Sequence, residues 1–107
     1  MRVELVVVPG CPHEGVAADA LRSALADTGL SDVPVHTRVV RTDREAADVG
    51  FTGSPTILLD GVDPFAHPGA RPGLACRLYP TATGPAGVPD AGQLRMALTR
   101  AAAGHQP

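Results

Sequence analysis

The chain has 107 residues, of which 44% are hydrophobic, so we expect a single domain around one modest core. Its formal net charge of -2 offers no basic surface for nucleic acid, and no apolar run approaches the about eighteen residues of a membrane span. With aromatic residues at only 3%, the core must be built from Val, Leu, Ile and Ala. No signal-peptide pattern opens the chain, and we expect a cytoplasmic protein whose two cysteines are catalytic, redox-active or metal-binding rather than a structural disulfide.

The first apolar run ends in a turn that carries a cysteine. Residues 2–8 are rich in Val and Leu, which predicts a strand buried on both faces. Pro9 and Gly10 end this strand, and Pro12 suits the first turn of a helix because its missing N–H is not needed there. Cys11 would lie at or just before the helix N-terminus, where unpaired backbone N–H groups and the helix dipole favour the thiolate. The pattern therefore predicts a reactive thiol.

The next elements follow from hydrophobic periodicity and capping signals. Apolar residues recur every three or four positions up to about Thr28, which predicts an amphipathic helix with Gly29 as its stop. Alternation over residues 33–40 predicts a second strand, and Pro34 near its start favours an edge position. Residues 42–45 have the form of a capping box, so a short helix is expected to reach Val49 and stop at Gly50.

A third buried strand is predicted over residues 56–61. Residues 62–75 are dense in Pro and Gly, which favours an ordered excursion without regular structure. Residues 76–80 are a plausible fourth strand, residues 81–88 a second Gly/Pro-rich connection, and Asp90 and Gln93 can cap a last helix. We expect a domain over residues 1–103 with the order β-α-β-α-β-β-α, and a frayed tail over residues 104–107.

Three motifs in this order resemble those of the thioredoxin superfamily. Cys11-Pro12-His13-Glu14 is similar to the glutaredoxin Cys-Pro-x-Cys, and its Pro-His pair matches the periplasmic disulfide oxidase. Residues 50–59, Gly-Phe-Thr-Gly-Ser-Pro-Thr-Ile-Leu-Leu, resemble the segment that leads to a cis-proline and the third strand. Residues 87–94 resemble the glycine-led entry to the last helix. The resemblance implies a thioredoxin-like α/β fold with a four-stranded mixed sheet flanked by helices.

The resemblance also implies roles for individual residues. Cys11 matches the nucleophilic cysteine, Pro55 the cis-proline that faces it, and Ser54 a residue offering backbone groups to an extended substrate. Neighbouring positions complete the predicted substrate-binding set, namely Pro12, His13, Glu14 and Gly87. The chain departs from the family where the resolving cysteine would stand, because that position is Glu14.

Two titratable residues follow Cys11 closely. We expect Glu14 to be a first-turn carboxylate that stabilises the helix rather than a proton shuttle, and His13 to have a solvent-facing ring. The other histidines lack the Cys/His spacing of a structural zinc site, and we expect them to be solvated: His36, His67 and His105. No cofactor and no resident metal site are expected.

The position of Cys76 leaves two arrangements open. In a fourth strand antiparallel to the third, it would lie away from Pro55 and about 10 Å from Cys11, beyond the about 7 Å between Cα atoms that a disulfide allows. As part of a folded-back excursion, it could meet Cys11 as a resolving thiol or a second soft-metal ligand. Residues 62–75 would be pinned by Phe65 and Leu74, either as a cover over one edge of the substrate groove or as an insertion at the far end of the sheet.

The leading hypothesis is a thiol–disulfide oxidoreductase in which Cys11 attacks a disulfide, a sulfenic acid or a glutathione mixed disulfide, with resolution by Cys76 or an external thiol. The partner would be a disulfide- or thiol-bearing protein or a glutathione-like molecule. Small bacterial relatives that share the Asp63-Pro64-Phe65 and Cys76-Arg77 patterns are sometimes labelled alkylmercury lyase-like, which implies soft-metal or organomercurial binding by Cys11 and Cys76 as an alternative. A third alternative is a non-catalytic thioredoxin-like module that holds an extended peptide.

Overall fold

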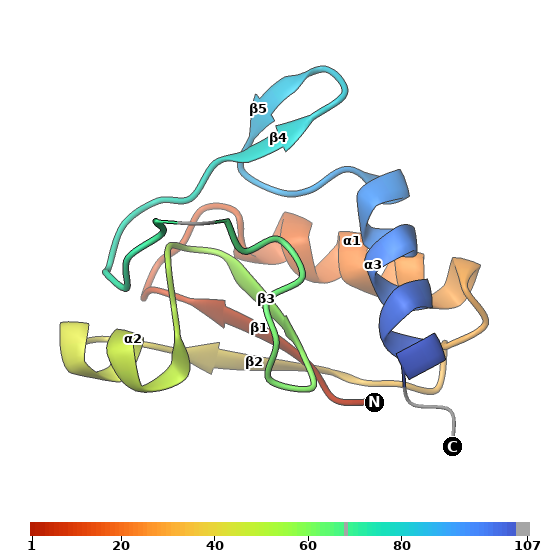
Figure 1. The fold of residues 1–107 in the computed structure, drawn as a ribbon, viewed down its shortest axis with the longest axis horizontal. Coiled ribbons are helices and arrows are strands. Elements are labelled where there is room, and N and C mark those ends of the chain that lie inside the picture. Colours follow the sequence, from red (N-terminus) through yellow and green to blue (C-terminus); the bar gives the residue numbers. More distant parts are fainter. Residues whose placement is uncertain (68, 105–107) are drawn as a thin grey trace.

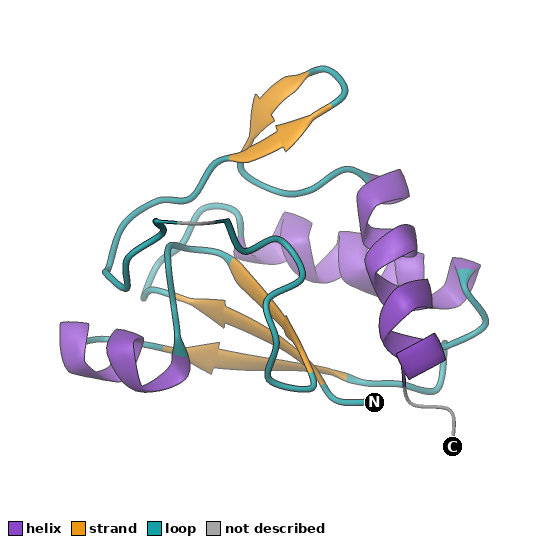
Figure 2. Cartoon of the chain, viewed as in Figure 1, coloured by secondary structure: helices purple, strands orange, loops and turns teal. Residues whose placement is uncertain are grey.

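The computed structural model describes residues 1–67 and 69–104, which form an α/β domain with a main sheet, a separate hairpin and three helices (Figures 1 and 2). The elements in chain order are β1 (Val3–Val7), α1 (Glu14–Asp27), β2 (Val35–Val39), α2 (Asp43–Val49), β3 (Thr56–Leu59), β4 (Tyr79–Thr81), β5 (Gly84–Ala86) and α3 (Ala91–Gly104).

β1 is the central strand of the main sheet, whose order is β2-β1-β3. It pairs parallel to β2, with Val3 opposite Val35, and antiparallel to β3, with Val3 opposite Leu59. All five residues of β1 are buried, which confirms the predicted strand covered on both faces.

The helices cover the two faces of the sheet unequally. α1 and α3 pack together over one face with Val3, Leu5 and Val7, and this is the larger core cluster. α2 lies at the opposite end from α3 (Figure 1), and Ala46 packs there with Val6 in a smaller cluster. β1 can serve both clusters because successive strand residues point to opposite faces of a sheet.

The local capping predictions are confirmed. The Thr42 hydroxyl oxygen accepts a hydrogen bond from the Glu45 backbone N–H at 3.1 Å, and the helix ends at Gly50 with φ 72. Asp90 and Gln93 exchange two bonds of 2.9 Å between side-chain oxygens and backbone N–H groups at the start of α3. α1, by contrast, begins at Glu14 with His13 as its N-cap, so the prediction of Pro12 in its first turn is wrong.

The predicted four-stranded sheet is wrong: the chain has a three-stranded mixed sheet and a two-stranded hairpin, β4-β5. Among the described residues, the second edge of β3 pairs with no strand, and the Pro/Gly-rich excursion is joined to this region by isolated bridges at Leu59–Val62 and, just beyond its end, Ser54–Cys76. The excursion is dense in proline, which has no N–H to donate, so it cannot form a continuous ladder. The hairpin stands away from the sheet (Figure 1) and occupies part of the predicted second connection.

The ends of the described chain bear on two further expectations. Gly104 is the last residue of α3, while the rest of the expected tail, residues 105–107, lies outside the described residues. Within residues 1–67 and 69–104, no helix combines the length and the apolar character needed to cross a membrane.

Gly53 lies in a position that only glycine fits without strain, because the backbone of Arg77 passes close to it. Substituting Gly53 therefore tests whether the end of the excursion packs on this residue. Its φ is 137, and an added Cβ would lie 2.7 Å from the Cβ and 3.2 Å from the Cα of Arg77. We expect Gly53→Ala to lower the free energy of unfolding by at least about 2 kcal/mol, through backbone strain and the loss of this close approach. Urea denaturation monitored by circular dichroism measures the change.

The matched control is Gly15→Ala in α1. Gly15 is exposed and has a normal φ, and nothing lies within 4 Å of the added Cβ. This variant should be as stable as the parent or more stable by up to about 1 kcal/mol, because alanine favours the helix. Equal stability of the two variants would contradict the close packing of residues 75–77 on Gly53.

Candidate thiol site

Cys11 lies in a tight turn between β1 and α1. Its backbone N–H donates to the Val8 carbonyl at 3.3 Å, and its carbonyl accepts from the N–H of Glu14, the first residue of α1, at the same distance. Gly10 has φ 70, which a turn of this kind favours. The Cys11 side chain is half-buried against the larger core cluster. The backbone of the turn therefore fixes where the thiol can lie.

The Ser54–Pro55 peptide bond is cis, as predicted. Ser54 and Pro55 are buried directly before β3, and the Ser54 hydroxyl oxygen accepts a hydrogen bond from the Val8 N–H at 3.1 Å. Val8 thus bonds to Ser54 through its N–H and to Cys11 through its carbonyl. One residue joins the cis-proline segment to the cysteine turn.

Cys76 belongs to the same neighbourhood. It forms a parallel bridge with Ser54, in which the Ser54 N–H donates to the Ala75 carbonyl at 2.7 Å and the Arg77 N–H donates to the Ser54 carbonyl at 3.1 Å. The alternative of an antiparallel fourth strand carrying Cys76 away from Pro55 is wrong, because the bridge is parallel and lies one residue from the cis-proline. Both cysteines are free thiols, with Cys76 exposed. The Ser54 backbone groups expected to meet an extended substrate are bonded to the chain's own segment.

The excursion is anchored by the buried side chain of Arg77, which the sequence analysis did not single out. Its guanidinium forms an ion pair of 2.6 Å with Asp63, whose side chain and that of Arg77 are only 10% and 7% exposed. It also donates to the Phe65 carbonyl at 2.7 Å and to the hydroxyls of Thr52 and Thr56 at 3.3 and 3.4 Å. A local signal existed: Asp63-Pro64-Phe65 forms a turn in which the Asp63 carboxylate accepts from the Phe65 N–H at 2.8 Å.

Tyr79 connects this cluster to the cis-proline. Its hydroxyl donates to the Pro55 carbonyl at 2.5 Å, and its ring meets Phe65 edge-on with 5.6 Å between centroids. The Arg77 guanidinium lies 4.5 Å from the centre of the same ring. Burial raises the pKa of Tyr79 well above its usual range, and the Arg77 charge offsets part of that rise.

Phe65 is half-buried against the larger core cluster, which confirms it as a pin for the excursion. Leu74 is 41% exposed, so the expectation that it also pins the excursion is wrong. Isolated bridges tie the excursion to the chain at both ends, at Leu59 in β3 and at Ser54 just before β3.

The remaining predicted site residues are Pro12, His13 and Glu14, which follow Cys11 directly, and Gly87, which precedes α3. The His13 ring packs against Gly87, where an added Cβ would meet ring atoms at 2.7 Å, so the expectation of a solvent-facing ring is wrong. Glu14 is half-buried in the first turn of α1, and Pro12 is exposed. The contact between His13 and Gly87 therefore joins the start of α1 to the segment before α3.

The other histidines are placed in part: His36 and His67 are exposed, and His105 lies outside the described residues. Over residues 1–67 and 69–104, no group of three or more His, Cys, Asp or Glu side chains could hold a metal ion.

Comparison of the chain with protein-family models, curated proteins and solved structures gives no match. The resemblance to thioredoxins consequently rests on the sequence motifs, of which the structure confirms the cis Ser54–Pro55 bond.

Tyr79 should make the protein sensitive to alkali in a defined pH range. Its pKa is raised in the folded protein, so folding keeps the phenol neutral. This contribution is fully present below about pH 10, where the unfolded tyrosine is also neutral, and is lost as the pH rises further. The free energy of unfolding should then fall by about 1.4 kcal/mol per pH unit from this group.

No other tyrosine and no lysine titrates in this pH range to obscure the slope, because Tyr79 is the single tyrosine and every one of the nine basic residues is Arg. Urea denaturation at several pH values gives the slope, and tyrosinate absorbance should appear together with unfolding. Tyr79→Phe should be less stable at neutral pH, having lost its bond to Pro55, yet lack this slope. Tyrosinate formation in a still-folded protein near pH 10 would contradict the burial of the phenol.

Proposed function

We propose that the protein carries out thiol–disulfide exchange with Cys11 and Cys76 as a reacting pair. The observation that carries this proposal is the bridge between Cys76 and Ser54, one residue from the cis-proline and bonded through Val8 to the Cys11 turn. Paired residues in adjacent chain segments point to the same face, so the Cys76 side chain leaves the backbone on the side of the Ser54 hydroxyl. That hydroxyl is directed at the cysteine turn.

The helix start supports Cys11 as the first nucleophile. His13 is the N-cap of α1, and its side chain makes no capping hydrogen bond. The Glu14 N–H donates to the Cys11 carbonyl, and the N–H groups of Gly15 and Val16 in the same first turn are oriented to donate to an anion just before the helix. The like charge of Glu14 opposes this effect in part, since Glu14 shares the same end of the helix.

The exchange balances with these two residues and an external disulfide. The Cys11 thiolate attacks one sulfur of the disulfide, a bond forms from Cys11 to that sulfur, and the other sulfur leaves as a thiolate. The Cys76 thiolate then attacks the Cys11 sulfur, and the second half of the substrate leaves. The substrate is reduced to two thiols while the protein is oxidised to a Cys11–Cys76 disulfide, which an external thiol must reduce before the next cycle.

The bonding of Ser54 favours small disulfides as substrates. An extended peptide cannot pair with the Ser54 backbone while residues 75–77 hold both groups. A small disulfide of the glutathione type needs no such backbone pairing and can approach through the exposed side of Cys76.

Single cysteine variants test the reacting pair. We expect mild oxidation of the parent protein to give an intramolecular disulfide, seen in the intact mass as the loss of two hydrogens without dimerisation. Neither Cys11→Ser nor Cys76→Ser can form it, and each should instead accumulate a glutathione adduct when treated with glutathione disulfide. In Cys76→Ser, the folded Cys11 should react faster with iodoacetamide at neutral pH than the same thiol in urea.

Two results would overturn the proposal. One is a parent protein that oxidises only to dimers or glutathione adducts, because the two thiols would then not meet. The other is a folded Cys11 that is alkylated no faster than in the unfolded chain. Circular dichroism of each variant shows that the comparison is made on folded protein.

A second candidate function is the binding of a soft metal ion or organomercurial by the same two thiols. Two free cysteines whose chain segments are both bonded to Ser54, Cys76 by its bridge and the Cys11 turn through Val8, favour it, since thiolates select soft ions and two ligands suffice for a linear site. We expect one mercuric ion per chain with the parent protein in the presence of a competing thiol, and loss of that binding in either Cys→Ser variant. Undiminished binding by Cys76→Ser would exclude a two-thiol site while leaving the exchange tests unaffected.

A further inference from the structure

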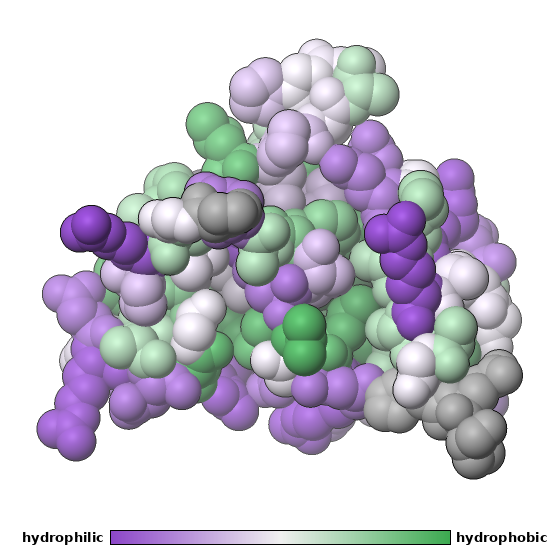
Figure 3. Space-filling model, in the orientation of Figure 1, coloured by the Kyte–Doolittle hydropathy of each residue, from purple (hydrophilic) through white to green (hydrophobic). Residues whose placement is uncertain are grey.

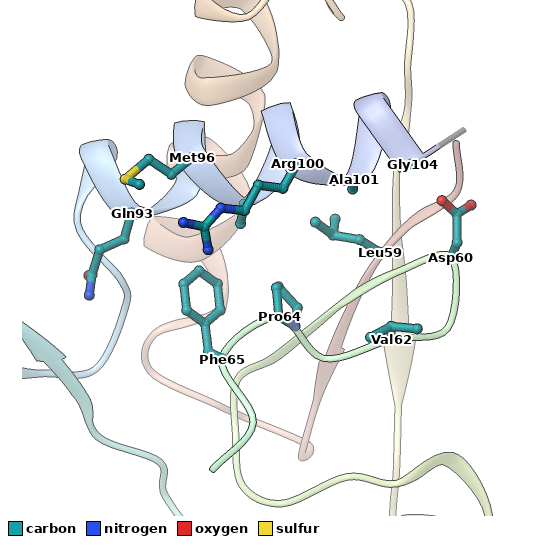
Figure 4. Close-up of a pocket in the computed structure, with 11 residues that line it drawn as sticks. Leu59, Asp60, Val62, Pro64, Phe65, Gln93, Met96, Arg100, Ala101 and Gly104 are labelled. Atoms are coloured by element: carbon teal, nitrogen blue, oxygen red, sulfur yellow. The ribbon is translucent and has the colours of Figure 1, made fainter. Parts of the chain in front are cut away.

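A groove of about 640 Å³ lies between α3 and the segment that leaves the end of β3 (Figure 4). Its lining is mostly apolar and includes Leu59, Pro64, Phe65, Met96, Ala97 and Ala101. Figure 3 shows hydrophobic surface between α3 and this segment on the face turned to the viewer. The volume falls within the about 300–1,000 Å³ of small-molecule sites.

The groove exists because neither wall fills it. On α3 two of the lining residues, Ala97 and Ala101, lie one helical turn apart and contribute only methyl groups, although the longer side chains of Met96 and Arg100 also line the groove. On the other wall the chain turns tightly at Asp63-Pro64-Phe65 and is held by Arg77. The rigid turn cannot collapse onto the helix, and the space between them stays open.

The rim of the groove exposes large apolar side chains to water. Val62 is 65% exposed and Met96 is 58% exposed, and they approach the groove from opposite walls. The buried side chain of Leu59 forms part of its floor. An occupant with an apolar body would remove this surface from water at about 25 cal/mol per Å².

The charged side chains along the groove favour an occupant that carries an anionic group at one end. Arg100 on α3 extends its guanidinium over the groove (Figure 4), and within the described part of the chain it forms no ion pair or hydrogen bond. Asp60 lies at the other end, where its carboxylate accepts a hydrogen bond from the Arg2 N–H at 2.8 Å. An anion is therefore attracted to the Arg100 end and repelled at the Asp60 end.

We propose that this groove binds a small apolar carboxylate, with its anionic head at Arg100 and its hydrocarbon or aromatic body between Leu59, Pro64 and Ala101. The site is separate from the two thiols and does not depend on their chemistry. Met96 suits an occupant of variable shape because its side chain is unbranched and adaptable.

Octanoate is the probe, titrated at neutral pH into isotope-labelled protein and followed by amide chemical shifts. We expect saturable binding of one molecule per chain below about 5 mM, with the largest shifts at Val62, Phe65 and Ala101. Arg100→Gln should weaken binding roughly fivefold, the size expected of an exposed charge pair. Octan-1-ol, which has the same chain without the charge, should bind more weakly to the parent and equally to both proteins.

Two further variants separate the groove from general effects. Arg44→Gln removes an exposed charge on α2, at the opposite end of the molecule (Figure 1), and should leave octanoate binding unchanged. Ala101→Leu fills the groove and should abolish binding while melting cooperatively, since Ala101 is only half-buried.

Several outcomes would overturn the proposal: no saturable binding, equal binding of octanoate and octan-1-ol, shifts centred away from the groove, or undiminished binding by Ala101→Leu. Sedimentation of the free protein supplies a last criterion. A concentration-dependent dimer that is broken by Ala101→Leu would mean that a second copy occupies the groove instead of a small carboxylate.

Discussion

The buried ion pair between Arg77 and Asp63 is the constraint on which the rest of this structure depends. A guanidinium with 7% exposure is tolerated only because a carboxylate at 2.6 Å, a backbone carbonyl and two hydroxyls surround it. Asp63 stands at the start of the Pro/Gly-rich excursion and Arg77 just after its end. The pair therefore closes the excursion into a loop, and this closure sets Cys76 beside Ser54.

The same cluster links two regions with different chemistry. Tyr79 lies under the Arg77 guanidinium, meets Phe65 edge-on and bonds through its hydroxyl to Pro55, beside the Cys76 bridge. Phe65 is also a wall of the apolar groove beside α3. Neither region could be reshaped without disturbing Phe65 or Tyr79, so the thiol site and the groove share one rigid support although their proposed ligands differ.

The sequence was most informative where structure depends on near neighbours. The caps at Thr42 and Asp90 involve residues three positions apart, and β1, in which four of five residues are Val or Leu, can be recognised without its partner strands. The fourth strand was predicted wrongly because the path after Leu59 is set by an ion pair spanning fourteen positions, for which periodicity carries no signal. The His13 ring was misplaced for the same reason, since Gly87 reaches it only through the folded chain.

Ser54 is bonded to both of the chain segments that carry the two cysteines. Its backbone holds the Cys76 segment through two hydrogen bonds, and its hydroxyl holds the Cys11 turn through Val8. The two thiols differ in exposure, with Cys11 half-buried and Cys76 open to solvent. In the proposed exchange, a partner that pairs with the Ser54 backbone would have to displace the Cys76 segment, whereas a small disulfide would not. Because Arg77 anchors the segment in the core, displacing it would break a buried ion pair, and the proposed exchange is therefore expected to favour small disulfides that leave the segment in place.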